Sequence, residues 1–550
     1  MKWRIKSLIF AFGALYLFLI FCLYNLQIQK STYYLSKVEA QEEASGVLQA
    51  PRGDIYFTDK NNAFVPAAFD KDFPMIYADP KEVQQEIQKS GESIETLAKK
   101  LSPIINIATD QLQKKISKQN DSYELLVSKA STEQINEIKK LNLKGVYISD
   151  HLLRFYPFNG ISSHLLGFVD SSQGAETGRY GAELYFNDLL SGKDGKVENG
   201  RVIPPQPGDD LTLTIDQNIQ AEAERTVKKL VEQYGAEAGS VIVEEPATGK
   251  ILAMGSFPNF DPNNYSKSNI ANFLNPAVQA VYEPGSVFKL ITMAAGIDSG
   301  KITPDTTYTD TGSFTANNMT ITNWDYTTHG PYGRVTMTNV IEHSINTGAV
   351  FAERQTGPDI FYNYLVKFGF SQLTNIALPG EVKGNINNLK KGQDIDFATA
   401  AYGQGVAVTP IELISAISAI ANGGTLMKPI ILSDDKPQVI KRVISQATAK
   451  AVTKMMVSAV EKNVIAAIPN YSIAGKTGTA FVPNFGGKGY TDQVINTYVG
   501  FAPASSPKFI VLIKLDKPYG APLAGQSVVP AFHDLTQFIL NYYNIAPDKL

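Results

Sequence analysis

Three short motifs in this sequence carry the residue types that perform acyl transfer on a serine. In chain order they are Ser286-Val287-Phe288-Lys289, Ser344-Ile345-Asn346 and Lys476-Thr477-Gly478-Thr479. Pro284 and Gly285 interrupt regular structure just before the apolar stretch 290–297, which predicts that Ser286 stands at a helix N-terminus. Residues three apart on a helix share one face, so the amine of Lys289 is expected beside the hydroxyl of Ser286.

The first motif therefore predicts a serine nucleophile with a lysine as its base. A serine hydroxyl attacks a carbonyl carbon poorly unless a neighbouring group removes its proton. An ordinary lysine has a pKa of about 10.4, and lowering it by about three units, or roughly 4 kcal/mol, would make Lys289 an effective base near neutral pH. Burial and a second cation both lower a lysine pKa, and Lys476 is the expected second cation.

The third motif has the pattern of a strand. Alternation along 472–482 places Lys476 and Gly478 on one face and the hydroxyls of Thr477 and Thr479 on the other. The two hydroxyls would bind a substrate carboxylate, and the glycine would let the substrate backbone approach the strand. Taken alone, such a segment is most often a turn, so the order of the three motifs carries the argument.

The remaining groups complete a site for acyl transfer. The backbone amides of Ser286 and Thr479 could form an oxyanion hole, in which a single donor is typically worth about 3 to 4 kcal/mol. Ser344 could relay a proton toward the leaving amine, and Asn346 could hold substrate amide groups or Lys289 itself. By itself, the Ser-Ile-Asn motif is more often a helix cap.

Composition limits the other classes of function. The 550 residues suffice for two or three domains, and 44% hydrophobic residues with a net charge of -3 argue against a disordered chain or a nucleic-acid partner. The only cysteine is Cys22, and the five histidines lack the spacing of helical metal sites. We therefore expect neither a metal nor a cofactor.

The N-terminus has the pattern of an uncleaved membrane anchor. Lys2, Arg4 and Lys6 precede an uncharged apolar run at 7–29, which is long enough to cross a bilayer as a helix. A cleaved signal peptide is the rival, but 22–27 offers no small-residue cleavage site. The basic flank predicts a cytoplasmic N-terminus, with the residues after the anchor outside the cell membrane.

We predict three parts and an α+β fold. The anchor occupies 1–30, a first extracytoplasmic domain 31–205 and the domain with the three motifs 206–550, with a Pro-rich linker near residue 205. Expected helices include 81–89, 94–101, 132–141, 217–233 and 532–543, and a largely helical block is expected from 286 to about 421. Expected strands in the last domain are 239–244, 250–256, 472–482, 495–501 and 508–515. Hairpin connections between most of these strands predict a five-stranded antiparallel sheet covered by helices.

Together these residues resemble the penicillin-binding proteins, in particular the class B monofunctional D,D-transpeptidases. Further motifs look like the family's extended pedestal, a dimerisation-type domain: Arg52-Gly53-Asp54-Ile55, Arg154-Phe155-Tyr156-Pro157, His164-Leu165-Leu166-Gly167 and Gly178-Arg179-Tyr180-Gly181-Ala182-Glu183. Others look like its transpeptidase domain: Leu213-Thr214-Ile215-Asp216, Glu245-Pro246-Ala247-Thr248-Gly249, Gly403-Gln404-Gly405-Val406 and Ala421-Asn422-Gly423-Gly424. Val287 departs from the family, which usually has a small hydroxyl residue there.

The resemblance implies both roles and partners. Ser286 would be the acylated nucleophile, Lys289 its base, Ser344 and Asn346 the second motif, and Lys476, Thr477 and Thr479 the third. The substrates would be peptidoglycan stem peptides ending in D-Ala-D-Ala, and β-lactams would acylate the same serine. A polytopic glycosyltransferase and division-complex proteins would be partners, because the surroundings of Tyr282-Glu283-Pro284-Gly285 resemble septal members more than elongation members.

Two other classes remain open from the sequence. A serine β-lactamase or D,D-carboxypeptidase shares the three motifs, and Glu381 with Asn385 is the nearest candidate for a deacylating pair. A β-lactam sensor or inactive scaffold is the non-enzymatic alternative. The intact motifs argue against an inactive scaffold.

Overall fold

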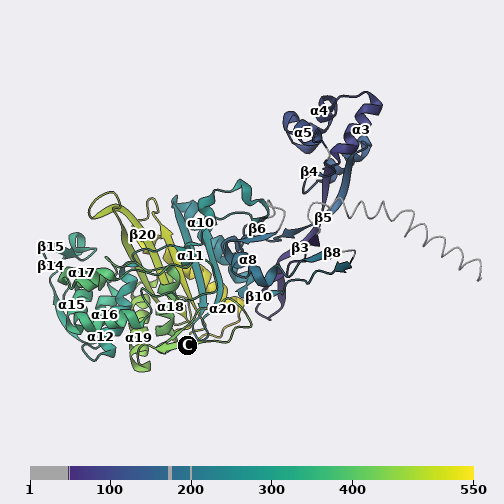
Figure 1. Ribbon diagram of the computed structural model, residues 1–550. Helices are drawn as coiled ribbons and strands as arrows, with labels where there is room; N and C mark the ends of the chain where they lie inside the picture. The colour runs from purple at the N-terminus through teal and green to yellow at the C-terminus, as the bar shows by residue number, and fades with distance from the viewer. Residues whose placement is uncertain (1–46, 49, 120, 171–175, 199–200, 550) are drawn as a thin grey trace, which may run out of the picture. The chain divides into compact units, whose positions relative to one another are not determined.

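The computed structural model describes residues 47–48, 50–119, 121–170, 176–198 and 201–549 (Figure 1). The predicted membrane anchor lies outside these residues, and within them no helix is both long and apolar enough to cross a bilayer. The chain forms two compact units. The smaller contains Asp70–Phe155, Ser191–Gly208 and the described residues before Gly53, and the larger contains Gly53–Phe69, Tyr156–Leu190 and the chain from Asp209 onward.

Helices with one apolar face build the smaller unit. They are α3 (Pro80–Ser90), α4 (Ile94–Ile105), α5 (Thr109–Ile116) and α6 (Thr132–Leu141), which confirms the three helices predicted in this region and adds α5. Leu101, Leu112 and Ile138 share one buried core under these helices. Strands β4 (Glu124–Val127) and β5 (Val146–Phe155) pair with β3 (Phe64–Ala78), and β1 (Val47–Leu48), β8 (Gly195–Glu198) and β9 (Arg201–Ile203) form a separate three-stranded sheet.

Segments early in the chain fold into the larger unit. Strand β2 (Ile55–Thr58) pairs in parallel with β10 (Leu211–Asp216). Glu224 of α10 (Gln217–Tyr234) accepts a hydrogen bond from the backbone nitrogen of Ser162 at 2.6 Å. The larger unit also contains α7 (Ser163–Leu166), β6 (Phe168–Asp170), β7 (Thr177–Arg179), α8 (Gly181–Tyr185) and α9 (Asn187–Leu190). The compact units therefore do not divide at residue 205, and the predicted domain boundary stays a prediction.

A five-stranded antiparallel sheet forms the centre of the larger unit (Figure 1). Its order is β12 (Lys250–Phe257), β11 (Ala238–Glu245), β21 (Phe509–Asp516), β20 (Tyr490–Ala502) and β19 (Ala474–Pro483). Every neighbouring pair is antiparallel. All five predicted strands, and their assembly into one antiparallel sheet, are thus confirmed.

Helices cover both faces of this sheet. In β21, Val511 and Ile513 belong to the core under α10 and α20 (Val528–Tyr542), whereas Ile510 and Leu512 belong to the core on the opposite side, which contains α18 (Pro410–Ala421). Successive strand residues point to opposite faces, so burial on both sides requires a nearly continuous apolar strand.

The segment between β12 and β19 contains the first two of the three motifs. Its main helices are α12 (Lys289–Asp298), α14 (Met337–Glu342), α15 (Asn346–Thr356), α16 (Pro358–Lys367), α17 (Asp394–Ala400), α18 and α19 (Gln446–Lys462). The block predicted as largely helical also contains two hairpin-like pairs, β13 (Thr307–Asp310) with β16 (Gly333–Thr336) and β14 (Ser313–Ala316) with β15 (Met319–Thr322). These short strands were not predicted. Farther along the chain, β17 (Thr425–Met427) pairs with β18 (Val439–Arg442).

Ser286 does not lie in the first turn of the α-helix itself. It belongs to a 3-10 turn, η4 (Gly285–Phe288), and α12 begins at Lys289. A short 3-10 turn commonly leads into an α-helix, and it still places residues three apart on one side. The predicted proximity of serine and lysine therefore survives this change of local geometry.

Candidate active site

The turn that carries Ser286, η4, packs directly against the backbone of β19. Gly285 has φ of +57°, and a Cβ added there would lie 2.8 Å from the carbonyl oxygen of Thr479. A Cβ added at Gly403 would lie 2.1 Å from the carbonyl oxygen of Gly285, and the Gly403 carbonyl accepts a hydrogen bond from the Gly285 nitrogen at 3.0 Å. Only glycine fits this backbone conformation and this close approach without strain. Ser286 is consequently fixed beside the strand that carries the third motif.

Gly478 serves the same close packing. A Cβ at this position would lie 2.6 Å from the carbonyl oxygen of Pro284 and 3.0 Å from the buried side chain of Val287. The sequence predicts that Gly478 lets a substrate backbone approach the strand, and the turn that carries Ser286 also needs this space. The family departure at Val287 is a buried side chain in this contact.

Lys289 is completely buried and lies at the centre of the site. Its Nζ is 3.0 Å from the Oγ of Ser286, 2.5 Å from the carbonyl oxygen of Ser344 and 2.8 Å from the Oδ1 of Asn346. The carbonyl and the amide oxygen can only accept hydrogen bonds. They hold the amine in place while the serine hydroxyl remains in contact with it.

Ser344 joins the two lysines. Its Oγ lies 3.2 Å from the Nζ of Lys289 and 3.0 Å from the Nζ of Lys476. The residue has φ of +57°, a left-handed conformation that is costly for serine and that points its carbonyl at Lys289. One hydroxyl is thus in hydrogen-bonding contact with both amines.

The environment lowers the affinity of both lysines for protons. Burial lowers the pKa of Lys289 well below its usual range, the positive charge of Lys476 lowers it further, and the charge of Asp325 opposes both. Burial lowers the pKa of Lys476 to about 7. Since the pKa of both amines is lowered, geometry separates them: within the described chain, Lys289 is the lysine that contacts the Oγ of Ser286.

The two threonines of the third motif have different partners. The Oγ1 of Thr477 lies 3.1 Å from the Nζ of Lys476, and the Oγ1 of Thr479 donates to Asn496 at 3.2 Å. Thr479 also accepts from the backbone nitrogen of Ala524 at 3.2 Å. Both threonines are half-buried, so they line the same stretch of strand edge but are held by separate contacts.

A buried polar network holds the second motif. The Nδ2 of Asn346 donates to the carbonyl of Thr322 at 2.9 Å. The hydroxyl of the next residue, Thr347, donates to Asp310 at 2.5 Å, and its backbone nitrogen donates to the side-chain oxygen of Asn323 at 3.2 Å. Asparagine and serine of the motif are therefore positioned by a hairpin region that precedes them by about twenty residues.

The candidate for a deacylating base is occupied elsewhere. Glu381 accepts hydrogen bonds from the backbone nitrogen and the hydroxyl of Thr374 at 2.7 and 2.5 Å, and from the backbone nitrogen of Asn375 at 3.0 Å. Asn385 caps its own loop through the nitrogen of Asn387 at 2.9 Å. These contacts stabilise the loop that contains Glu381. None of the hydrogen bonds that Glu381 makes in the described chain involves Ser286.

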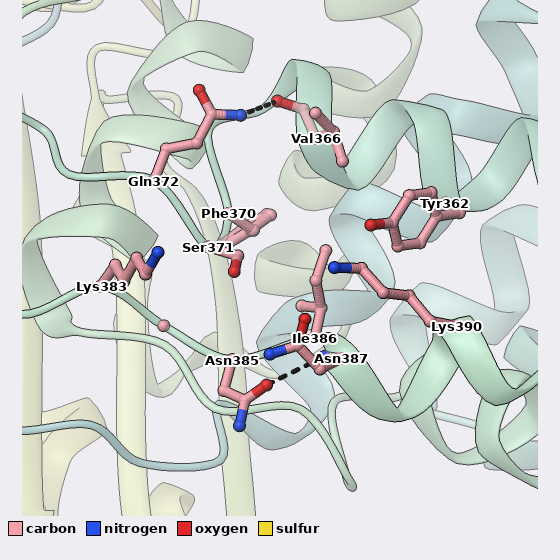
Figure 2. Close-up of a pocket in the computed structure, with 11 residues that line it drawn as sticks. Tyr362, Val366, Phe370, Ser371, Gln372, Lys383, Asn385, Ile386, Asn387 and Lys390 are labelled. Carbon is pink, nitrogen blue, oxygen red and sulfur yellow. Dashed lines mark hydrogen bonds between the residues drawn. The ribbon is translucent and has the colours of Figure 1, made fainter.

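A separate polar pocket lies near this loop (Figure 2). It has a volume of about 470 Å³ and includes Lys383, Lys390 and Ser371 among its lining residues. Figure 2 shows the two lysines on opposite sides with Ser371 between them. None of the eight predicted site residues lines it.

Among the described residues, no group of three histidine, cysteine, aspartate or glutamate side chains could hold a metal ion.

Comparison with known proteins identifies the two regions of the chain. The family model of the penicillin binding protein transpeptidase domain matches residues 239–537, and that of the penicillin-binding protein dimerisation domain matches residues 47–213. The chain belongs to the class B penicillin-binding proteins. This penicillin-binding protein is a monofunctional D,D-transpeptidase, so the enzyme class predicted from its sequence is confirmed.

Individual relatives cover most of this penicillin-binding protein. It is 32% identical to stage V sporulation protein D of Bacillus subtilis, over 90% of this chain and 79% of that protein. It is 30% identical to the peptidoglycan D,D-transpeptidase FtsI of Escherichia coli, over 88% of this chain and 83% of that protein. The crystal structure of penicillin binding protein 3 from Mycobacterium tuberculosis, complexed with aztreonam, has a TM-score of 0.70 and 26% identity, covering 91% and 98% of the two chains.

Sequence reasoning missed the acidic side of the site. The sequence analysis did not identify Asp310 and Asp325. Asp310 accepts a hydrogen bond from the hydroxyl of Thr347, and the charge of Asp325 raises the pKa of Lys289. No local pattern marks them, because their partners lie tens of residues away in the sequence. The one available signal is the density of polar residues in 308–326 between two helices, which is unusual for a simple connection.

Proposed function

We propose that this D,D-transpeptidase cross-links peptidoglycan stem peptides through an acyl-enzyme on Ser286, with Lys289 as the base. The contact between the Nζ of Lys289 and the Oγ of Ser286, at 3.0 Å, carries the proposal. A neutral lysine has two N–H groups and one lone pair. When the N–H groups donate to the carbonyl of Ser344 and to Asn346, the lone pair remains for the hydroxyl proton of Ser286.

Acylation forms an ester between Ser286 and the penultimate D-alanine and releases the terminal D-alanine. The O–H bond of Ser286 breaks as Lys289 takes the proton, and its Oγ bonds to the carbonyl carbon of the penultimate D-alanine. The amides of Ser286 and Thr479 stabilise the oxyanion. The C–N bond to the terminal D-alanine breaks as its nitrogen receives the proton through Ser344, which contacts both lysines.

The second half of the reaction transfers the acyl group. An amine of a neighbouring stem peptide attacks the ester carbonyl carbon and gives up a proton to Lys289. The C–O bond to Ser286 breaks, and the Oγ of Ser286 takes that proton from Lys289. Lys476, Thr477 and Thr479 are proposed to bind the carboxylate of the donor terminus, because a cation and two hydroxyls at one strand edge suit a carboxylate. The cation of Lys476 also disfavours protonation of Lys289.

The proposed place of action is the outer face of the cell membrane during division. The basic flank and apolar run at 1–30 support a single anchor with a cytoplasmic N-terminus and an extracytoplasmic catalytic domain. The septal resemblance around Tyr282-Glu283-Pro284-Gly285 supports partnership with a polytopic glycosyltransferase and division-complex proteins. A fluorescent fusion observed at mid-cell agrees with this role, and an exclusive side-wall position contradicts it.

Covalent labelling tests the nucleophile. The full-length protein treated with penicillin should carry one adduct, on the peptide that contains Ser286, when analysed by mass spectrometry. Ser286→Ala should abolish the adduct while its thermal unfolding remains cooperative. An adduct on another residue, or one that persists in Ser286→Ala, would overturn the assignment.

The hydrolytic alternative is tested by turnover of a chromogenic β-lactam. Because Glu381 is held by Thr374 and Asn375, we expect an acyl-enzyme that persists for minutes or longer. Glu381→Gln should leave this lifetime unchanged. Rapid hydrolysis that disappears in Glu381→Gln would instead favour a β-lactamase.

A further inference from the structure

The site contains a buried carboxylate that the transpeptidase motifs do not include. Asp325 is 7% exposed, and its Oδ2 accepts a hydrogen bond from the hydroxyl of Tyr332 at 2.5 Å. Its Oδ1 is buried and accepts no hydrogen bond from any described residue. A buried carboxylate with one oxygen unsatisfied is costly unless a nearby positive charge compensates it.

The segment that carries Asp325 is tied to both ends of the second motif. The indole nitrogen of Trp324 donates to the carbonyl of His343, immediately before the motif, at 3.3 Å. The side-chain oxygen of Asn323 accepts from the nitrogen and hydroxyl of Thr347, immediately after it, at 3.2 and 3.0 Å. Asp325 is therefore held at a defined position relative to Ser344 and Asn346, the residues that contact Lys289.

Tyr332 is equally well held. Its backbone nitrogen donates to Asp310 at 2.8 Å, and its ring stacks on His329 and lies against His343 with centroids 4.1 and 5.0 Å apart. Burial, the hydrogen bond to Asp325 and the charges of Asp325 and Asp310 raise the pKa of Tyr332 above its usual range. The tyrosine therefore stays a hydrogen-bond donor to Asp325 over the working pH range.

The balance of buried charge gives Asp325 a role. Lys289 is fully buried and Lys476 is 4% exposed, and the hydrogen-bond partners that the described chain offers the two amines are uncharged. Two ammonium groups bridged by one hydroxyl repel each other strongly in such surroundings. When Lys289 takes the proton of Ser286, this repulsion reaches its maximum, and a fixed negative charge nearby reduces it.

We propose that Asp325 is the counter-ion of Lys289, and that it sets the pH range in which Lys289 can accept the serine proton. Asp325 acts through Lys289 and touches no reacting atom, so it is a positioning residue in the electrostatic sense. The inference rests on the proposed function of Lys289 as the base. It adds a residue that none of the three motifs contains.

The direction of the expected pH effect follows from the charge. The carboxylate stabilises the protonated form of Lys289 and so raises its pKa against the opposing effects of burial and Lys476. Acylation requires the neutral amine. Asp325→Asn should therefore move the acidic limb of the acylation rate profile to lower pH, by about half a unit to one unit.

Stopped-flow acylation of the full-length protein by a fluorescent penicillin, from pH 5 to 10, measures this limb. Tyr332→Phe removes the hydrogen bond but keeps the charge, so its limb should move less than that of Asp325→Asn. Asp298→Asn is the matched control: Asp298 also accepts from a tyrosine, Tyr364, at 2.7 Å, but stands at the far end of α12 from Lys289. It should lower stability without moving the limb.

Two outcomes would overturn the inference. One is a uniform loss of rate in Asp325→Asn with the limb unmoved, which indicates a purely structural role. Asp325→Ser, whose hydroxyl can still bond Tyr332, is made in parallel, and failure of both variants to unfold cooperatively would also assign a structural role. The proposed nucleophile is tested separately by Ser286→Ala, so failure of this inference leaves that test unaffected.

Discussion

Lysines in the two units of this protein show how burial changes one side chain. In the catalytic site, Lys289 and Lys476 are buried, and their pKa values are lowered. On the helices of the smaller unit, Lys99, Lys100 and Lys140 are about half or more exposed and each pairs with a glutamate at 2.6 Å. Water screens the exposed pairs, whereas the buried amines interact through a medium of low dielectric constant.

The glutamates show the same contrast. Lys99 lowers the pKa of the exposed Glu95 through a hydrogen bond and its charge. Burial raises the pKa of Glu244, in the central sheet, to about 7. Charge placed on a helix surface therefore contributes little to either stability or chemistry, while charge buried under the sheet and helices is expected to control both.

The largest expected effect separates the two buried lysines. Lys289→Arg should reduce the rate of β-lactam acylation by about 10²- to 10⁴-fold at every accessible pH, because a guanidinium stays protonated and cannot act as a base. Lys476→Arg keeps a cation beside Ser344 and should retain more activity. Stopped-flow rates from pH 6 to 10 test this, with thermal melts as a check on folding. Equal losses, or a greater loss in Lys476→Arg, would mean that the base is wrongly assigned.

A smaller effect is expected on the pH dependence of stability. The folded-state pKa of Glu244, about 7, lies above its ordinary value of 4.5, so the folded protein binds a proton that the unfolded chain releases between these values. Stability should fall as the pH rises through this window, by about 3 kcal/mol in total from this residue. Glu244→Gln should remove that part of the decline.

Thermal unfolding of wild type and Glu244→Gln at pH 5 and pH 8 measures this difference. Burial raises the pKa of Glu224, Glu283 and Glu353 in the same direction, so the decline should become shallower rather than disappear. An unchanged slope in Glu244→Gln would show that the carboxyl is not buried as the structure has it.

The smallest effect belongs to the surface of the smaller unit. Lys140 and Glu137 of α6 form an ion pair with side chains 71% and 51% exposed. Glu137→Gln should change the free energy of unfolding by about 0.5 kcal/mol or less, an effect reduced further in 1 M salt. Acylation of Ser286 should not change. A loss of acylation in this variant would contradict the contrast between the two units.

Local signals predicted the elements whose causes lie within a few residues. Helix α6 begins and ends where the sequence indicated, because Ser131 and Gln134 form a capping box and Asn142 takes the left-handed conformation at its C-terminus. The five sheet strands were equally readable from their apolar runs. The short strands β13 to β16 were not, since four-residue polar strands have no periodic pattern of their own.

Non-local pairing decided the division into units. Strand β2 pairs with β10, about 155 residues later in the chain, and a linear reading placed the two in different domains. The composition of a linker indicates which segment of the chain connects two folded parts. It does not indicate which distant strands will share hydrogen bonds.

The order of the motifs and the proximity of Ser286 and Lys289 follow from local sequence, because residues three apart lie about one helical turn from each other. The contacts of Ser344 with both lysines, and the effect of the Asp325 charge on Lys289, follow from the tertiary structure. Asp325 stands 36 residues after Lys289 and 151 before Lys476, and no periodicity links such positions. The packing of a hairpin region, a helix and a sheet strand buries Lys289 and Lys476 together and so lowers the pKa of each.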